Sequence, residues 1–446
     1  MFSNILEKIK NKHFLSLAGN GIMSVLGMIT MAVLYRALPV SEIGVWVFFQ
    51  SIVLLVDTFR SGFLTTAFIK FYAGATPERA AEVVGSAWYI ASSITAILLL
   101  INLPAMFFLN EVTNPGLAMF FKWFGLTYIF TLPSFIATCV LQGDQRFDRL
   151  LLIRFISQGS FILFVIILIV INQISLQTVV YANLLSALIT SLFALFAGWV
   201  HVKLFVKRTG NCIRELFHFG KYSVGTTLSS NLFRSSDTFI INFMLGPAAL
   251  AVYNLGQRLM EVVEIPLRSF AATGMPALSA AYNQNNKQEV ITTLKKYAGM
   301  LTVALVPVTI MAFLFANVAI GLIGGGKYIG TEAPNVLRIF MTFALLYPVD
   351  RFFALTIDVI HQPKINFIKV LVMLAGNIIF DFVGIYVFGN IYGVALATVV
   401  PILIGTLVGN WALQRYSRFS FISIYKFGYK ELLQSIRQAL GKKAFA

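Results

Sequence analysis

Charged side chains lie inside segments of this chain that are otherwise apolar, and they are the residues best able to do chemistry. A charged group at the centre of a membrane helix costs about 2.5–3.5 kcal/mol on insertion scales. Residues of this kind usually face a water-filled cavity or pair with one another. The arginines are Arg60, Arg234, Arg258, Arg268 and Arg351, and the acids are Asp57, Asp237, Glu261, Glu264, Asp350, Asp358 and Asp381.

Spacing places several of these charges on shared helix faces, because residues three or four apart lie one above the other on a helix. The pairs with this spacing are Asp57–Arg60, Arg234–Asp237, Arg258–Glu261 and Glu264–Arg268. A longer polar stripe in the segment 250–274 consists of Asn254, Arg258, Glu261, Glu264 and Arg268. Such a stripe predicts one inward face along the length of that helix.

Two interpretations of the charges remain open for any single arginine. In the first, the guanidinium groups line a hydrated path for an anionic substrate, because they bind phosphate through paired, charge-assisted hydrogen bonds. In the second, each arginine only neutralises a neighbouring acid. For the set as a whole we favour the path, because structural pairs alone would rarely gather on one stripe.

The acids could also carry protons or sodium ions that drive transport. Asp358 and Asp381 have no opposite charge nearby in sequence on their own helices, so they are the better candidates for ion coupling.

Composition indicates what must position these residues. The chain of 446 residues is 58% hydrophobic and only 12% charged, with a mean hydropathy of +0.82. Soluble domains carry about 25% charged residues. The fold class predicted is an all-α polytopic membrane protein.

About twelve segments are long and apolar enough to cross a bilayer, which takes roughly 20 residues of helix. Their period is helical, and the short alternating segments of an outer-membrane barrel are not seen. The predicted spans are 14–37, 43–69, 83–108, 117–141, 150–171, 174–200, 221–244, 250–274, 297–322, 336–360, 366–388 and 391–414.

The formal charge of +16 is distributed by side and does not indicate nucleic-acid binding. Most of the 34 lysines and arginines fall in alternate connections and in the tail, whereas the opposite set holds only Arg36, Lys122, Lys327 and Arg338. This bias is the positive-inside pattern. It predicts that both termini lie in the cytoplasm and that the outward loops are short, and no cleavable signal is evident.

A short sequence pattern also recurs after about half of the membrane region. A tight proline turn before an aromatic residue occurs at Pro39 and again at Pro247. We therefore expect two six-helix lobes related by a pseudo-two-fold axis along the membrane normal. The expected domains are an N-terminal lobe, a cytoplasmic linker, a C-terminal lobe and a basic tail, at 1–200, 201–220, 221–414 and 415–446. The tail fits a basic helix on anionic lipid and a solvated tail equally well.

Motifs of soluble enzymes are absent from the sequence. We find no P-loop, no metal-spaced His/Cys cluster and no Gly-x-Ser-x-Gly elbow, so we expect neither catalysis nor a cofactor nor a metal. Cys139 and Cys212 fall on or beside the cytoplasmic side, where a disulfide is not expected.

Several stretches resemble the polysaccharide-flippase (Wzx-type) branch of the MOP superfamily, which also contains the MATE-like multidrug exporters. The first is Tyr35 to Pro39 with Glu42 to Trp46. The others are Ser236 to Ile241 with Leu245 to Pro247 and Tyr253, then Met275 to Ser279, and Gly326 to Tyr328 with Val336 to Arg338. The chain departs from the usual pattern at Ala251, where a glycine is expected.

The resemblance implies transport of an undecaprenyl-diphosphate-linked oligosaccharide repeat unit from the cytoplasmic to the outer leaflet by alternating access. This step would serve the assembly of O-antigen (lipopolysaccharide), capsule or exopolysaccharide, with polymerase and chain-length proteins of the pathway as further partners. Carried over to this chain, Arg60, Arg234, Arg258, Arg268 and Arg351 would contact diphosphate or acidic sugars. The alternative is an ion-coupled antiporter of small molecules, driven by protons or sodium ions. An excess of arginine on the inward stripe favours the anionic head group.

Overall fold

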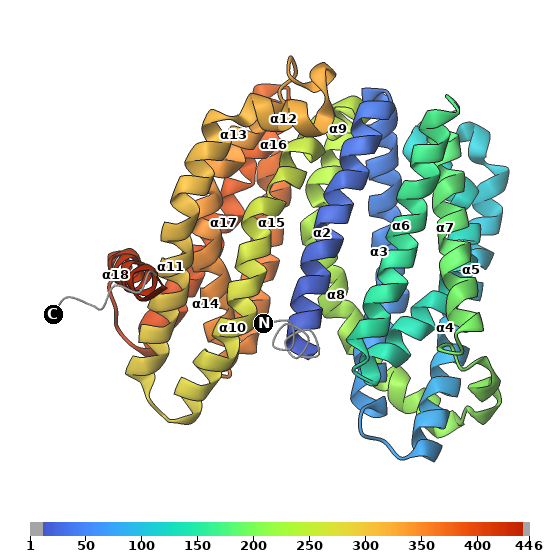
Figure 1. The fold of residues 1–446 in the computed structure, drawn as a ribbon, viewed down its shortest axis with the longest axis horizontal. Helices are drawn as coiled ribbons and strands as arrows, with labels where there is room; N and C mark the ends of the chain where they lie inside the picture. Colours follow the sequence, from blue (N-terminus) through green and yellow to red (C-terminus); the bar gives the residue numbers. More distant parts are fainter. Residues whose placement is uncertain (1–11, 440–446) are drawn as a thin grey trace. The chain divides into compact units, whose positions relative to one another are not determined.

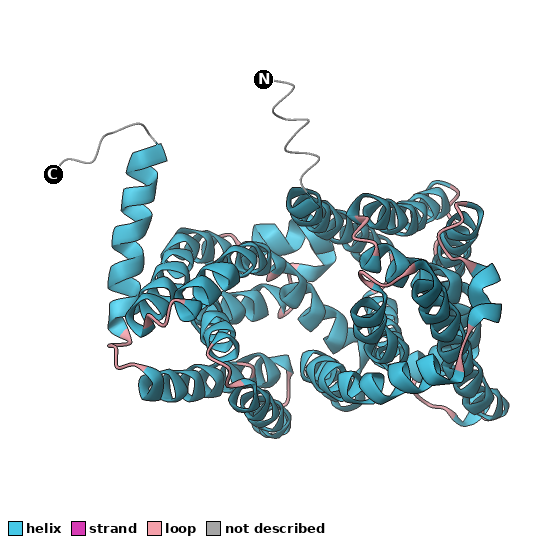
Figure 2. Cartoon of the chain, turned by 90° about the horizontal axis from the view of Figure 1, so that it is seen from below, coloured by secondary structure: helices cyan, strands magenta, loops and turns pink. Residues whose placement is uncertain are grey.

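The structure is a computed structural model that describes residues 12–439, and all regular secondary structure in that range is helical (Figures 1 and 2). Contacts divide the chain into two compact units, Met1–Ser235 and Ser236–Ala446. The boundary falls inside one helix, α8 (Gly210–Met244). The expected linker 201–220 therefore lies within the first unit.

The first unit is a bundle of antiparallel helices joined by short turns. Its main packing pairs are α3 with α5, α5 with α7, α6 with α7 and α2 with α6. A core of buried apolar residues forms around Ile136, Val140 and Leu216. The helices are α2 (Lys12–Ala37), α3 (Val40–Tyr72), α4 (Pro77–Phe107), α5 (Pro115–Gly143), α6 (Phe147–Val170), α7 (Leu176–Phe196) and the first part of α8, with 3-10 turns η1 (Leu109–Glu111) and η2 (Val202–Lys207).

The expected linker is held against α4 and is not a free connection. The indole nitrogen Nε1 of Trp88 donates to the carbonyl oxygen of Val200 at 2.9 Å. Gly85 lies against the carbonyl of Leu204, where any side chain would collide with the backbone of η2. Arg79 near the start of α4 makes an ion pair with Glu215 on α8.

The second unit contains interrupted helices. Its segments are the end of α8, then α9 (Gly246–Leu259), α10 (Glu261–Asn283), α11 (Lys287–Leu314), α12 (Ala316–Gly324), η3 (Gly326–Tyr328), α13 (Ala333–Phe343), η4 (Ala344–Leu346), α14 (Tyr347–Val359), α15 (Pro363–Phe388), α16 (Ile391–Ala397), α17 (Val399–Tyr416) and α18 (Ile422–Ala439). α15 packs on α16 and α17, and α14 packs on α10, α11 and α17.

Nine helical segments of the described chain are long and apolar enough to cross a membrane. They confirm an all-helical, multi-pass membrane protein. The other three predicted spans coincide with α2, α8 and the pair α9–α10. α8 and α10 are less apolar because they carry Arg234, Asp237, Glu261, Glu264 and Arg268.

Several helices end in the same way. Left-handed residues follow α5 at Gln145 and α14 at His361. The next residue then donates back across the helix end in both places, from Arg146 to Leu141 at 2.9 Å and from Gln362 to Ile357 at 3.0 Å. This 6→1 bond is the mark of a Schellman helix end. The same end also follows α6 at Asn172, α7 at Gly198 and α10 at Asn285, so it is a general way of ending helices in this chain.

The basic tail forms a helix that packs on the second unit. α18 runs across α11, so Figure 1 shows it end-on while α11 lies lengthwise. Gly428 of α18 and Gly299 of α11 meet backbone to backbone, where neither could carry a side chain. Lys296 also bridges to Glu431 at 2.7 Å. The tail is therefore helical through Ala439 and lies against α11.

Candidate functional site

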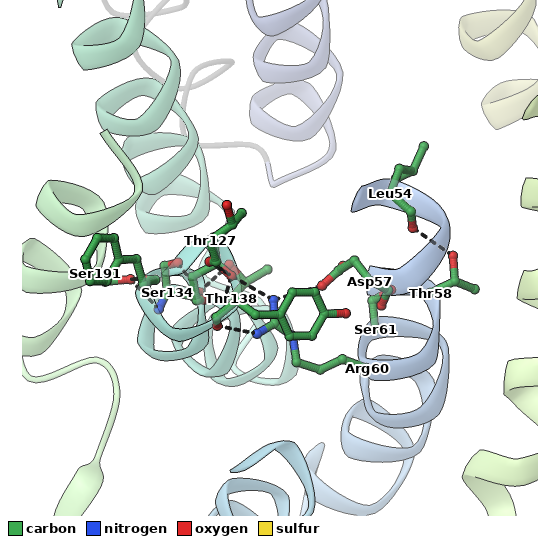
Figure 3. A network of polar contacts seen from close by, with 12 residues as sticks. Leu54, Asp57, Thr58, Arg60, Ser61, Thr127, Ser134, Thr138 and Ser191 are labelled. Atoms are coloured by element: carbon green, nitrogen blue, oxygen red, sulfur yellow. Dashed lines mark hydrogen bonds and ion pairs between the residues drawn. The ribbon is translucent and has the colours of Figure 1, made fainter. Parts of the chain in front are cut away.

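Arg60 is locked between two helices of the first unit and is almost fully buried, with 3% exposure. Its Nη2 donates to Asp57 on its own helix at 2.8 Å and to Thr131 on α5 at 3.0 Å. Its Nη1 donates to the carbonyl oxygen of Tyr128 at 3.1 Å. Figure 3 shows Arg60 reaching from α3 toward the polar side chains of α5.

Aromatic rings complete this enclosure. The guanidinium carbon of Arg60 lies 4.3 Å from the ring centre of Tyr128 and 4.9 Å from that of Phe135. Desolvated cation–π contacts of this kind are worth about 2 kcal/mol. The geometry therefore gives Arg60 a structural role in joining α3 to α5, which departs from the substrate contact expected for it.

Two carboxylates meet in the interior of the second unit. Asp237 on α8 and Asp381 on α15 are 6% and 0% exposed. One amide joins them, because Nδ2 of Asn377 lies 2.6 Å from Oδ1 of Asp237 and 3.0 Å from Oδ2 of Asp381. The hydroxyl of Tyr253 donates to Oδ2 of Asp237 and lies 3.2 Å from Oγ1 of Thr398.

No basic side chain neutralises this acidic cluster, defined as Asp237, Asp381, Asn377, Tyr253 and Thr398. Among residues whose side chains are described, neither acid forms an ion pair. Oδ1 of Asp381 is buried and has no hydrogen-bond partner in that part of the chain. Two like charges at one buried place repel, so a proton or a bound cation would relieve the cluster.

The oxygen-rich composition of the cluster suits a hard monovalent cation as well as a proton. Within residues 12–439 no group of three or more His, Cys, Asp or Glu side chains could hold a metal ion. The available ligands are instead two carboxylates and a hydroxyl pair, which are hard oxygen donors.

Lys369 and Asp350 form a second buried contact on the same helix face of α15. Nζ of Lys369, which is 2% exposed, lies 2.8 Å from Oδ1 of Asp350 on α14. Gly405 of α17 packs directly against this carboxylate. Sequence reasoning assigned Lys369 to the cytoplasmic boundary and so missed it. Its spacing of eight residues from Asn377 would have placed both on one face of α15.

The predicted stripe of the eighth span is divided in the structure. The helix breaks at Met260 between α9 and α10. Within α9, Asn254 is buried while Arg258, one turn further along, is exposed. Arg268, half exposed, bridges Glu261 at 2.9 Å and Glu264 at 2.8 Å. Glu261 therefore pairs with Arg268, and the pair with Arg258 suggested by its spacing is not formed.

Three of the predicted arginines are exposed and have no polar partner among the described residues. Arg234, Arg258 and Arg351 form neither an ion pair nor a hydrogen bond with any side chain that the structure describes. Arg234 is also separated from its expected partner, because Asp237 points into the acidic cluster. These three guanidinium groups are free to bind an anion.

Asp358 lies at a helix end and does not share the interior position of Asp381. It is exposed near the last turn of α14. Nδ2 of Asn366 donates to both of its carboxylate oxygens at 3.1 Å. As a coupling candidate it is therefore weaker than the sequence suggested, because water and an amide already satisfy its charge.

The described chain can now be compared with known proteins. A family model described as "Polysaccharide biosynthesis protein" matches residues 33–332, which is well over half of the sequence. This chain belongs to that family.

A curated relative and two solved structures are also similar. The relative is the probable low-salt glycan biosynthesis flippase Agl15 of Haloferax volcanii, 23% identical over 405 residues, covering 89% of this chain and 80% of that protein. An inward-facing MATE family transporter of the MOP superfamily matches with a TM-score of 0.72 at 18% identity, over 89% of this chain and 96% of that one. The lipid II flippase MurJ, in an inward closed conformation, matches with a TM-score of 0.73 at 15% identity, over 97% and 94%.

These matches confirm the fold expected from the resemblance. The chain has the fold shared by MATE transporters and MurJ, and it is a member of the polysaccharide biosynthesis protein family. All three similar proteins are named as transporters or flippases, which agrees with the expectation that this chain is not an enzyme.

Proposed function

We propose that this protein is a flippase that moves a lipid-linked glycan across the membrane. The observation that carries the proposal is that Arg234, Arg258 and Arg351 are exposed and unpaired within the described part of a chain of this family. Unpaired guanidinium groups are costly in a membrane protein unless they serve an anionic substrate. Their planar forks suit a diphosphate.

We further propose a specific substrate and a specific arrangement of the spanning helices. The cargo is an undecaprenyl-diphosphate-linked repeat unit for O-antigen, capsule or exopolysaccharide, moved to the outer leaflet by alternating access. Twelve spanning helices form two six-helix lobes related by a pseudo-two-fold axis, over 1–200 and 221–414. The termini lie in the cytoplasm of a bacterial cell, and polymerase and chain-length proteins act downstream.

The acidic cluster supplies the coupling ion in this proposal. Asp237 and Asp381 hold a proton or a sodium ion whose gradient drives the cycle. Two buried carboxylates without a basic partner support this role. The same cluster keeps open the second candidate function, an ion-coupled antiporter of small molecules, since MATE transporters share the fold.

The test of the cationic path is single substitution of the free arginines. We expect Arg234→Ala, Arg258→Ala and Arg351→Ala each to lower glycan export about tenfold or more, since one charge-assisted hydrogen bond contributes about 1.5–3 kcal/mol. Export would be measured in a strain lacking its own flippase, with membrane levels of each variant checked by immunoblot.

Two further variants separate binding from folding. Arg146→Gln, at an exposed turn, should leave export unchanged. Arg60→Ala should lower the amount of folded protein, because Arg60 holds α3 to α5. Full export by Arg234→Ala, Arg258→Ala and Arg351→Ala alike would show that the path is wrong. Efflux of drug cations by the unaltered protein, without glycan export, would favour the antiporter.

A further inference from the structure

An open cavity of about 560 Å³ lies in the first unit where three helices begin. It is bounded by the starts of α3, α5 and α7 and by the 3-10 turn η1. The polar residues lining it are Glu42, Asn110, Lys122, Trp123, Ser175 and Gln177. Its volume lies in the range of small-ligand sites, about 300–1,000 Å³.

The cavity holds one anion and one cation that do not pair with each other. The carboxylate of Glu42 accepts a hydrogen bond from the backbone nitrogen of Leu176 at 3.1 Å, which fixes it at the start of α7. Lys122 is exposed and makes no ion pair with any residue whose side chain is described. The lining is therefore neutral overall but carries separate positive and negative groups.

Aromatic rings form one wall of the cavity. Trp123 packs edge-on against Tyr181, with ring centres 5.1 Å apart. Nε2 of Gln177 donates to the hydroxyl of Tyr181 at 2.6 Å. Tryptophan and tyrosine beside lysine are typical of the level where lipid headgroups meet the hydrocarbon region.

An apolar track leads away from the cavity along two packed helices. On α5 the exposed side chains after Lys122 are Leu126 and Ile129, at 41% and 45% exposure. On α7 those after Tyr181 are Leu185, Leu192, Leu195 and Phe196, at 44%, 41%, 36% and 88%. Both helices begin at the cavity and pack against each other, so the track starts at the polar cavity and continues as hydrocarbon-facing surface.

We propose that this cavity binds the headgroup of a zwitterionic phospholipid that carries a primary ammonium and a phosphate. Lys122 binds the phosphate, Glu42 binds the ammonium, and the acyl chains lie along the apolar track of α5 and α7. A saccharide would use the polar groups but not the track, and an anionic headgroup would leave Glu42 as a repulsive neighbour. The site goes beyond the proposed flippase function and depends only on the protein's lying in a membrane.

The test is native mass spectrometry of the purified full chain in detergent. Phosphatidylethanolamine, phosphatidylcholine and phosphatidylglycerol with identical acyl chains are added in turn. We expect phosphatidylethanolamine to bind most tightly. Lys122→Gln and Glu42→Gln should each weaken that binding about tenfold, which corresponds to about 1.4 kcal/mol. Glutamine at position 42 keeps the acceptor for Leu176, so the start of α7 stays in place.

Matched variants show whether the loss is local. Lys122→Arg should retain binding, and Lys203→Gln, an exposed lysine on η2 far along the chain, should leave it unchanged. Equal or tighter binding of phosphatidylglycerol would overturn the proposal, as would lipid binding that neither cavity variant alters. Displacement of the phospholipid by a soluble oligosaccharide at matching concentration would also overturn it. Export assays on the same variants report on the flippase function separately.

Discussion

At the scale of single residues, the structure distinguishes charges that hold the fold together from charges that are free to act. Arg60 and Arg268 are both engaged by neighbours, one buried and one half exposed. Arg234, Arg258 and Arg351 are exposed without such partners in the described chain. The sequence does not distinguish these five arginines, because spacing along one helix does not show which side chains a neighbouring helix places beside them.

The acidic cluster could be predicted from the sequence only in part. Asp237 and Asp381 were both identified as membrane charges, yet their meeting required the approach of α8 and α15, which are far apart along the chain. Asn377 joins them and was overlooked because it is neutral. Lys369 was overlooked because it lies near a helix end, where a lysine ordinarily reaches water.

The acidic cluster yields a prediction about coupling. Asp237→Asn or Asp381→Asn should remove the dependence of transport on an imposed sodium or proton gradient, because an amide neither binds a proton in this range nor attracts a cation. The measurement is uptake of a labelled lipid-linked glycan into proteoliposomes, with one gradient imposed at a time. Asp358→Asn, at the exposed end of α14, is the matched control and should respond like the parent. Parent-like responses from both cluster variants would contradict the idea.

At the scale of elements, each of the twelve predicted spans coincides with one helix or with consecutive helices. The interruptions at Met260, Phe315, η4 and Thr398 were not predicted. The apolar pattern of a sequence indicates which residues are buried. It does not reveal these interruptions, because burial continues from one helix to the next across a break in the helix. The left-handed backbone conformation at Gln145 and His361 could not be predicted from the sequence either, since neither residue is the glycine usual at such helix ends.

The contact between α11 and α18 gives a prediction of its own. Gly428→Leu should push α18 away from α11, because a side chain there meets the backbone of Gly299 and Met300. Backbone amide exchange across Ile422–Ala439 should then rise toward that of an isolated short helix, which is marginal in water. Hydrogen–deuterium exchange of the purified protein measures it. Ser435→Leu, on the exposed face of α18, is the control, and unchanged exchange in Gly428→Leu would show that the contact does not hold the helix.

At the scale of the whole molecule, the fold follows from composition and charge placement more directly than the site does. Hydropathy identifies the membrane class, and nine described helices meet the length and apolarity needed to cross. Of the remaining three, α8 and the pair α9–α10 are more polar, which is expected of helices that line a hydrated path, whereas α2 is apolar over Gly21–Ala37. The distribution of lysine and arginine predicts an orientation in the membrane, which is open to direct measurement.

Topology can be tested with introduced cysteines. Cys139 and Cys212 are both buried, and burial raises the pKa of the Cys212 thiol, so the native background should be low. Asn172→Cys should react with an impermeant maleimide in intact cells, whereas Asn285→Cys should react only after the membrane is opened. The reverse labelling pattern would show that the predicted orientation is inverted. Labelling of both cysteines from outside would show that the chain crosses the membrane an even number of times between them, and not three times as predicted.

The contact between Gly428 and Gly299 also determines how the packing of α18 on α11 responds to ionic strength. Its ion pair within the described residues, Lys296–Glu431, is partly exposed and would weaken as salt shortens the Debye length. The fit of Gly428 against Gly299 depends on shape and not on charge. Added salt should therefore leave α18 docked, with Lys426, Lys430 and Arg437 presented at one fixed place on the second unit under dilute and concentrated conditions alike.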